Sequence, residues 1–439
     1  MKILQVVLAL SLLIIIHEAG HFTFAKLFGV KVDKFYLFFD AGGFRLFSTR
    51  NNRLLCRLFP KLKDAETDYG IGWLPLGGYC KISGMVDESM DTEYLNQDPQ
   101  PWEFRTRPAW QRFLVMAGGV LYNFVFAVLL YIAIMAIWGE VWVSNENADI
   151  YVNDLSYEMG FRTGDHIVSF DNWTPEDFNM LQADFVRRET RKAVVLRDSD
   201  TVELYIDQSY LPKVLETPGM FELALPFIVD SVVSANAEAG LMKGDRIFRI
   251  DSTEVRYMQE SRELLAACAG GEVDVCVERE GDTVCLNLAV DSLGKLGIYT
   301  YYPATLRTYS LFKAIPAGLR HAWESVSGYL RDMKLVFTPR TEAYKSVGSF
   351  IAIGSIFPSA WNWYQFINIL AMLSVMLGVM NLIPIPGLDG GHMVFIMYEM
   401  ITGRKPSDRF MMVMQYIGLF LLLALMVFAC GNDIGRLMR

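Results

Sequence analysis

The chain has 439 residues, 52 % of them hydrophobic, and a formal net charge of −9. The length predicts two to four domains, and the apolar fraction excludes a disordered protein and fits an ordinary soluble enzyme poorly. The acidic balance argues against a nucleic-acid partner, because a nucleic-acid binder normally carries a basic patch that meets phosphates.

Four apolar windows are each long enough to cross the hydrocarbon core of a membrane, which takes about 20 mostly apolar residues. They cover about residues 3–27, 113–138, 366–386 and 411–430. We therefore predict an α-helical polytopic membrane protein with four transmembrane helices.

The first window contains the run His17-Glu18-Ala19-Gly20-His21. Ionisable groups inside a span are costly, so they indicate a functional site. Lys2 followed by an apolar stretch also fits a cleaved signal peptide. Cleavage after the signal-like tripeptide ending at Ala25 would discard all three titratable groups, so we favour a retained span.

His17 and His21 are four residues apart, so on a helix they lie on one face and can bind one metal ion. Neutral imidazoles are good zinc ligands, and Glu18 could act as general base toward a water molecule that the metal activates. Two histidines packed in a helix interface would not account for the glutamate between them.

Basic residues predict the orientation of the spans, because cytoplasmic flanks are enriched in them. Those before the second and fourth spans are Arg105, Arg107, Arg112, Arg404, Lys405 and Arg409. We expect residues 28–112 and 387–410 to be cytoplasmic and 139–365 and both termini to lie outside. Lys2, Arg436 and Arg439 point the other way.

The segment between the second and third spans contains an internal repeat at a spacing of 80, in which residues 158–167 align with residues 238–247. Each copy has a Gly-Asp turn followed by an alternating strand. The duplicated pattern resembles tandem PDZ domains, which we expect at 139–213 and 214–302. PDZ domains bind peptides or C-termini by strand addition, although the pair could also be a structural spacer.

Cys276 and Cys285 flank a predicted hairpin turn at Glu280-Gly281. A two-residue loop there would place the two cysteines directly opposite each other, where side chains are closest. We predict a disulfide if the segment lies in an oxidising compartment; the alternative is two small strand residues.

Residues 303–360 form an amphipathic juxtamembrane segment. Its apolar residues recur at helical spacing from Thr308 to about Val336, which predicts a helix near the membrane that joins the repeat to the third span. Packing is its expected role.

The third span ends in a Pro- and Gly-rich run from Asn381 to His392 that contains Asp389. His17 is about 14 residues into the first span, roughly 21 Å along a helix, so the histidine pair and Asp389 reach a similar depth. Asp389 by itself would fit a turn that ends a span, but with the histidine pair it is the favoured third metal ligand. His392 is a spare candidate, for which capping or packing is favoured.

These motifs, together with Gly72 to Tyr79, Arg107 to Arg112, Ala117-Gly118 and Asn123, resemble the site-2 proteases over essentially the whole chain. The family consists of zinc metalloproteases that cut substrates within the membrane.

The resemblance implies that zinc is held by His17, His21 and Asp389 and that Glu18 is the general base. It also implies that Asn381, Gly77 and Gly78 bind the substrate backbone. A membrane re-entrant β-loop, expected at about 30–90, would pair with an extended substrate strand.

Two positions depart from the family pattern. The Gly-Phe-Gly of the loop reads Phe38-Phe39-Asp40-Ala41-Gly42-Gly43, and Gly119 stands where a proline often follows the Ala-Gly of the second span. We expect neither departure to touch a metal ligand.

The resulting prediction is a membrane domain at 1–138 and 361–439 that carries the inserted repeat on the periplasmic side of a bacterial inner membrane, with the active site toward the cytoplasm. The expected activity is zinc-dependent cleavage of single-pass membrane proteins, such as anti-sigma factors, after a prior ectodomain cut. Clearance of signal-peptide remnants is an alternative, and an inactive membrane-tethered PDZ adaptor is another. The intact set of His17, Glu18, His21 and Asp389 speaks against an adaptor.

Overall fold

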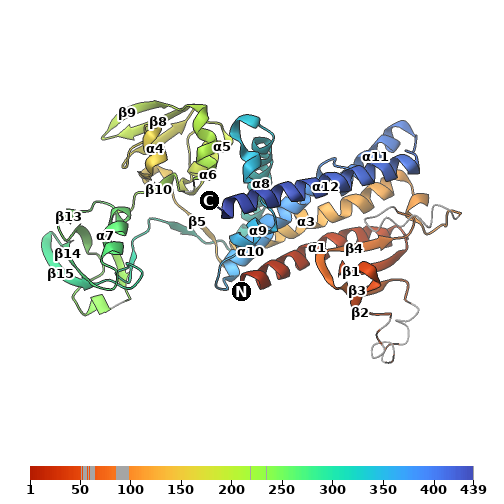
Figure 1. Ribbon diagram of the computed structural model, residues 1–439, viewed down its shortest axis with the longest axis horizontal. Coiled ribbons are helices and arrows are strands. Elements are labelled where there is room, and N and C mark those ends of the chain that lie inside the picture. The colour runs from red at the N-terminus through yellow and green to blue at the C-terminus, as the bar shows by residue number, and fades with distance from the viewer. Residues whose placement is uncertain are drawn as a thin grey trace. The chain divides into compact units, whose positions relative to one another are not determined.

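The computed structural model describes residues 1–50, 65–85, 98–217, 219–233 and 235–438, together with Asn52, Arg57 and Phe59. The chain folds as two compact units (Figure 1). The first, here called the membrane unit, comprises residues 1–139, 308–336 and 344–439. The second, here called the inserted unit, comprises residues 140–307 and 337–343.

Within the described residues, four helices are long and apolar enough to cross a membrane. They are α1 (Lys2–Leu27), α3 (Ala109–Ile137), α10 (Trp363–Leu382) and α12 (Asp408–Leu437). Each coincides with one of the four predicted windows, so the expected polytopic membrane protein is confirmed at this level. A hydrophobic stretch of this length has no other way to satisfy its backbone in lipid than as a helix or a closed barrel.

Helix α3 is the centre of the membrane unit and packs against α1 and α10 (Figure 1). It meets α1 at a contact between glycines, because a side chain at Gly20 would collide with the backbone of Gly118. The two backbones therefore approach more closely than larger residues would allow, in the manner of small-residue contacts in membrane helices.

A four-stranded sheet follows α1 and has the order β2-β3-β1-β4. Its strands are β1 (Val32–Phe39), β2 (Arg45–Ser48), β3 (Asp68–Gly72) and β4 (Leu74–Ile82). Strand β4 pairs antiparallel with β1, lies at the edge of the sheet and packs on α1. The predicted β-loop at about 30–90 therefore contains a sheet, and parts of this range lie outside the described residues.

The predicted amphipathic helix is α8 (Leu311–Val336), which packs on α3. Its buried face is formed by small residues, and a side chain at Gly318 would collide with the backbone of Ile132. Packing on the second span is therefore the role that the structure shows for this helix. Two further helices complete the membrane unit, α9 (Phe350–Ile356) and α11 (Asp389–Thr402).

The inserted unit consists of two halves that share an order of two strands, a helix, a two-stranded hairpin and a closing strand, so the sequence repeat is also a structural repeat. The first half contains β6 (Ile150–Val152), α4 (Asp154–Glu158), β7 (His166–Phe170), α5 (Leu181–Arg187), β8 (Lys192–Arg197), β9 (Asp200–Tyr205), α6 (Leu211–Glu216) and β10 (Phe221–Leu223). The second contains β11 (Val229–Val232), β12 (Arg246–Ile250), β13 (Thr253–Glu254), α7 (Ser261–Ala267), β14 (Glu272–Arg279), β15 (Asp282–Ala289) and β16 (Ile298–Thr300). Among the described elements, α4 and α6 occur in the first half alone and β13 in the second half alone.

In each half the last strand pairs with the first, β10 with β6 and β16 with β11. Strand β10 comes after the predicted division at 213/214, yet its pairing assigns it to the first half. Residues 214–223 therefore belong with the first repeat, because the strand that closes a small sheet can lie far along the chain from its partner.

A buried aspartate follows the turn glycine in both halves and makes the same contacts. Arg197 donates two hydrogen bonds to Asp165, at 2.7 and 2.8 Å, and Arg279 donates two to Asp245, both at 2.7 Å. Burial raises the pKa of the Asp245 carboxyl, but the hydrogen bonds from Arg279 and from the Met242 amide outweigh this and lower that pKa below its usual value. The Gly-Asp signature thus marks a fully paired carboxylate that fixes the turn.

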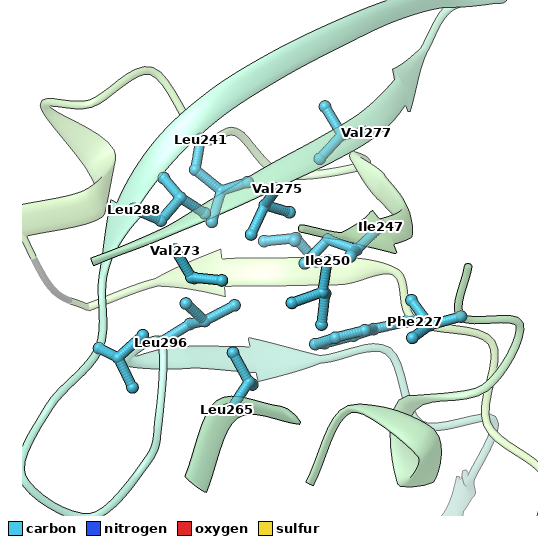
Figure 2. Packing of buried hydrophobic residues seen from close by; sticks show 13 residues of the cluster. Phe227, Leu241, Ile247, Ile250, Leu265, Val273, Val275, Val277, Leu288 and Leu296 are labelled. Atoms are coloured by element: carbon cyan, nitrogen blue, oxygen red, sulfur yellow. The ribbon is translucent and has the colours of Figure 1, made fainter. Parts of the chain in front are cut away.

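The core of the second half is made of aliphatic side chains and one aromatic ring. Figure 2 shows them between the strands and α7, where Val275, Val277 and Leu288 are fully buried. On the adjoining strands Cys276 and Cys285 are directly paired, with Cα atoms 4.0 Å apart, and they form a disulfide. The predicted disulfide is therefore present.

The inserted unit is closed by a pair of short strands at its two ends. Strand β5 (Glu140–Trp142) pairs antiparallel with β17 (Thr305–Arg307), and Glu140 lies opposite Arg307. The two ends of residues 140–307 therefore lie side by side, while residues 337–343 join the same unit from a later part of the chain.

Candidate metal centre

The three predicted metal ligands lie together in the membrane unit. His17 and His21 occupy successive turns of α1, and Asp389 is the first residue of α11. Asp389 Oδ2 is 3.2 Å from His17 Nε2 and 3.3 Å from His21 Nε2, and the two Nε2 atoms are 3.3 Å apart. The three atoms thus form a nearly equilateral triangle.

This triangle has the size that a zinc ion requires. In a tetrahedral site with bonds of about 2.0–2.1 Å, neighbouring ligand atoms lie about 3.3 Å apart. Asp389 Oδ2 is buried and makes no hydrogen bond within the described part of the chain. A buried carboxylate oxygen left without a donor is costly, so the arrangement fits a cation bound between the three side chains.

The protein also orients the imidazole of His21. Its Nδ1 lies 2.9 Å from the carbonyl oxygen of Val115 on α3. A carbonyl can only accept, so Nδ1 carries the proton, and Nε2 presents its lone pair to the centre. This backbone contact sets the tautomer that a metal ligand needs.

The loop between α10 and α11 places Asp389 against α1. Proline residues 384 and 386 end α10, and Gly387 takes a positive φ of 95°, a conformation that glycine adopts without strain. Helix α12 supports this loop closely, because a side chain at Gly418 would collide with the Pro386 carbonyl. The Pro- and Gly-rich pattern thus serves to bring Asp389 back to the histidines.

Glu18 lines the same cavity as the three ligand side chains. The cavity wall also includes Tyr79 and Cys80 of β4 and Met116 of α3. The predicted general base therefore faces the space between the metal ligands and the edge strand of the sheet.

The predicted substrate-binding residues Asn381, Gly77 and Gly78 lie at different places relative to the candidate metal ligands. Asn381 Nδ2 lies 3.4 Å from His17 Nε2, so the structure brings Asn381 to the centre. Gly77 and Gly78 lie on β4 just before the residues that line the cavity, and a side chain at Gly78 would collide with Ile14 of α1. Both glycines are therefore closely packed next to the site, and their predicted contact with substrate stays a prediction.

The expectation that neither departure from the family pattern touches a metal ligand was wrong for Gly119. A Cβ at this position would lie 2.5 Å from His21 Nε2 and 2.6 Å from His17 Cε1. Both imidazoles thus rest on the bare backbone of α3. The sequence could not show this contact, because it depends on how closely α1 and α3 cross.

The second departure changes the sheet and not the centre. Phe38 has a φ of 67°, in the left-handed region that favours glycine. Asp40 accepts a hydrogen bond from Lys34 at 2.8 Å and one from Tyr79 at 2.7 Å. These replacements therefore tie the end of β1 to β4.

Two polar contacts near the centre were not predicted. The Nδ2 atom of Asn123, on α3, lies 3.1 Å from His17 Nδ1. His392 Nε2 lies 3.2 Å from Gln415 Oε1 of α12. The available sequence signal was a lone polar residue within an apolar span, which indicates a buried partner without identifying it. His392 and Gln415 both line the cavity of the candidate centre, and the role of His392 stays a prediction.

Two histidines and an aspartate around one point, with a glutamate at the cavity wall and all on or between membrane helices, define a candidate intramembrane metalloprotease centre. The sequence profile of peptidase family M50 matches residues 5–425. The chain therefore belongs to peptidase family M50, the site-2 protease family of metalloproteases.

Several curated proteins are similar along their whole length. A candidate zinc metalloprotease of Ralstonia nicotianae is 26 % identical over 479 residues, which cover 100 % of this chain and 99 % of that protein. The regulator of sigma E protease of Salmonella typhi is 27 % identical over 461 residues, covering 98 % of each chain. The RseP protein of Salmonella typhimurium, a regulator of sigma-E protease, has the same identity and coverage.

Proposed function

We propose that the protein is a zinc-dependent endopeptidase that hydrolyses peptide bonds within or near the transmembrane segments of single-pass membrane proteins. The observation that carries the proposal is the triangle formed by His17 and His21 of the apolar helix α1 and Asp389 at the start of α11, with Glu18 in the same cavity. Zinc, when bound by these three side chains, would supply a Lewis acid that polarises the scissile carbonyl.

The remaining chemistry is assigned to the chain's own groups. Glu18 accepts a proton from the attacking water and delivers it to the leaving amine, as general acid–base catalysis requires. The Asn381 amide, near His17 at the end of α10, donates a hydrogen bond to the substrate backbone. Removal of either group should lower turnover without removing the metal ligands.

A peptide bond inside a helix is shielded, so cleavage requires local unwinding. The edge strand β4 offers a way to stabilise the unwound form, because an extended peptide can pair with it. Tyr79 and Cys80 of this strand line the metal cavity, so a peptide paired there lies beside Glu18. We propose that β4 holds the substrate strand in this way and that its sheet forms a membrane re-entrant loop.

We place the protein in a bacterial inner membrane with the inserted unit in the periplasm, as the basic flanks of the spans and the disulfide indicate. Its two halves are proposed to be PDZ-like modules that bind peptides or C-termini, or that exclude substrates with an intact ectodomain. Two relatives are named regulators of sigma E protease, and on this basis we propose anti-sigma factors as substrates.

The decisive experiment uses Glu18→Gln in the native membrane. The variant should retain zinc, lose cleavage and accumulate bound substrates that can be cross-linked and identified by mass spectrometry. Anti-sigma factors among the trapped proteins support the proposal, whereas signal-peptide remnants alone would indicate the clearance role. Unchanged biological activity in Glu18→Gln would instead support an adaptor without protease activity.

A further inference from the structure

Asn123 is a fully buried polar residue in the middle of α3. Its side-chain amide contacts the imidazole of His17, with Nδ2 3.1 Å from Nδ1. Its backbone carbonyl accepts a hydrogen bond of 2.8 Å from Ser374 Oγ on α10. The residue is therefore held in place from one side and faces a candidate metal ligand on the other.

The role of His17 dictates what its Nδ1 atom requires. Nε2 points to Asp389 and His21, so Nε2 is the ligand atom. A neutral imidazole that offers Nε2 to a metal carries its proton on Nδ1, and this N–H needs an acceptor. For His21 the acceptor is the Val115 carbonyl; for His17, Asn123 stands at the corresponding place.

As it is oriented, the side-chain amide of Asn123 does not supply the acceptor that His17 Nδ1–H needs. With Nδ2 toward Nδ1, two donors would face each other in the metal-binding tautomer. Asn123 Oδ1, meanwhile, is buried and has no hydrogen-bond partner within the described part of the chain. A rotation of the amide by 180° exchanges its two ends with little change in shape, and it gives Oδ1 the imidazole N–H.

We propose that Asn123 is the positioning residue of His17: in the zinc-loaded protein its Oδ1 accepts the hydrogen bond from His17 Nδ1–H and so directs Nε2 to the metal. The inference rests on the proposed function, because it assumes that His17 is a zinc ligand. It also makes the two histidines unequal. His21 is oriented by a backbone carbonyl that no substitution removes, whereas His17 depends on one side chain.

The test compares the zinc affinity of full-length variants in detergent, measured by competition with a chromophoric chelator. Asn123→Ala removes the acceptor and should weaken zinc binding about 10- to 100-fold, the usual effect of losing such an outer partner. Asn123→Asp keeps an oxygen at the same place, and because a carboxylate only accepts hydrogen bonds, its affinity should match or exceed that of the wild type.

Ser374→Ala is the matched control. It removes a buried hydroxyl that touches Asn123 but not His17, so it should lower the unfolding temperature while changing zinc affinity by less than about twofold. The unfolding temperature of each zinc-free variant shows whether it is folded. If Asn123→Ala fails to fold, Asn123→Asp still decides the matter.

Zinc affinity that falls in Asn123→Asp as far as in Asn123→Ala would show that packing, and not the acceptor, is what matters, and would overturn the proposal. Unchanged affinity in Asn123→Ala would overturn it as well, while leaving zinc binding and the protease proposal intact. If the variants follow the expected order but the wild type cleaves no membrane substrate, the positioning role stands and the proposed function fails.

Discussion

Aspartates in the two units have opposite surroundings. In the inserted unit Asp165 and Asp245 each receive two hydrogen bonds from one arginine, together with a backbone amide. In the membrane unit Asp389 Oδ2 faces two imidazole nitrogens and makes no hydrogen bond with any described residue. The paired carboxylates stabilise a turn. The arrangement of Asp389 instead fits a carboxylate that binds a cation.

The strongest way to break this comparison is Asp389→Ala. Zinc binding in peptides is worth about 10–16 kcal/mol over four ligands, so one ligand contributes about 3–4 kcal/mol and its loss should weaken zinc binding several hundredfold. With both imidazoles in the neutral form that a metal ligand needs, the zinc-free protein should lose little stability, because the removed oxygen makes no hydrogen bond with any described residue. Chelator competition and thermal unfolding measure the two effects. A marked loss of zinc-free stability would show that Asp389 is a structural carboxylate like Asp245.

The converse substitution is Arg279→Met in the inserted unit. It leaves the buried Asp245 carboxylate without its arginine and should destabilise the second half by about 3 kcal/mol. Hydrogen exchange of β12 and β14 in the full chain should accelerate accordingly. Zinc affinity should stay as in the wild type, and an effect on it would contradict the separation between structural and ligand carboxylates.

Removal of the Cys276–Cys285 disulfide tests the inserted unit independently of its aspartates. The double alanine variant should lose about 2–3 kcal/mol of stability, because the unfolded chain loses a constraint on a short loop. Hydrogen exchange of β14 should accelerate in this variant, and equally on reduction of the wild-type disulfide. Cys268→Ala should leave it unchanged, since Cys268 is outside the disulfide. Free thiols at both positions in protein isolated under non-reducing conditions would contradict the disulfide.

Gly119→Ala tests the candidate metal centre through the backbone of α3, against which both imidazoles lie. The new methyl group would displace both imidazoles, and overpacking of this kind costs about 1–3 kcal/mol, so zinc affinity should fall about 10- to 100-fold. Gly431→Ala is the control, because a Cβ there meets no atom within 4 Å, and alanine favours a helix by about 1 kcal/mol. Equal zinc affinity in both variants would show that the close contact with Gly119 is not maintained in solution.

The smallest effect concerns pH. The pKa of Asp245 is lower in the folded protein than its usual value, so the stability it contributes is present above the unfolded pKa of about 3.9 and is lost as pH falls through the folded pKa. The protection of β12 amides, measured against the exchange of the unfolded chain at the same pH, should therefore fall below about pH 4 in the wild type. In Arg279→Met this acid sensitivity should shrink, and an unchanged profile would mean that the arginine is not its cause.

Much of this architecture could be predicted from the sequence because it rests on local patterns. Apolar length identified the four spans, the histidine spacing identified one face of α1, and the repeated Gly-Asp turn identified the halves of the inserted unit. Even the approach of Asp389 to the histidines followed from the depth of each in its span. The Cys276–Cys285 pair followed from strand register alone.

What could not be predicted depends on how closely separate elements approach. The contact of Gly119 with both imidazoles requires the close crossing of α1 and α3. The membership of β10 in the first half of the inserted unit requires a pairing with β6 about 70 residues earlier. Asn123 was noticed as a motif residue, but its partner became evident only when α3 lay beside His17.

The strand pair at the two ends of the inserted unit has a consequence for how such proteins change over time. Glu140 and Arg307 are direct neighbours in the β5–β17 pair. Residues 140–307 are therefore an insertion whose two ends meet, in a chain that otherwise runs from α3 to α8. An insertion of this kind can be lengthened, duplicated or deleted without moving the helices on either side. A chain that joins Gly139 to Thr308 through a few glycines should therefore still fold its membrane unit. The 80-residue repeat has the form expected of a module that was duplicated within this insertion.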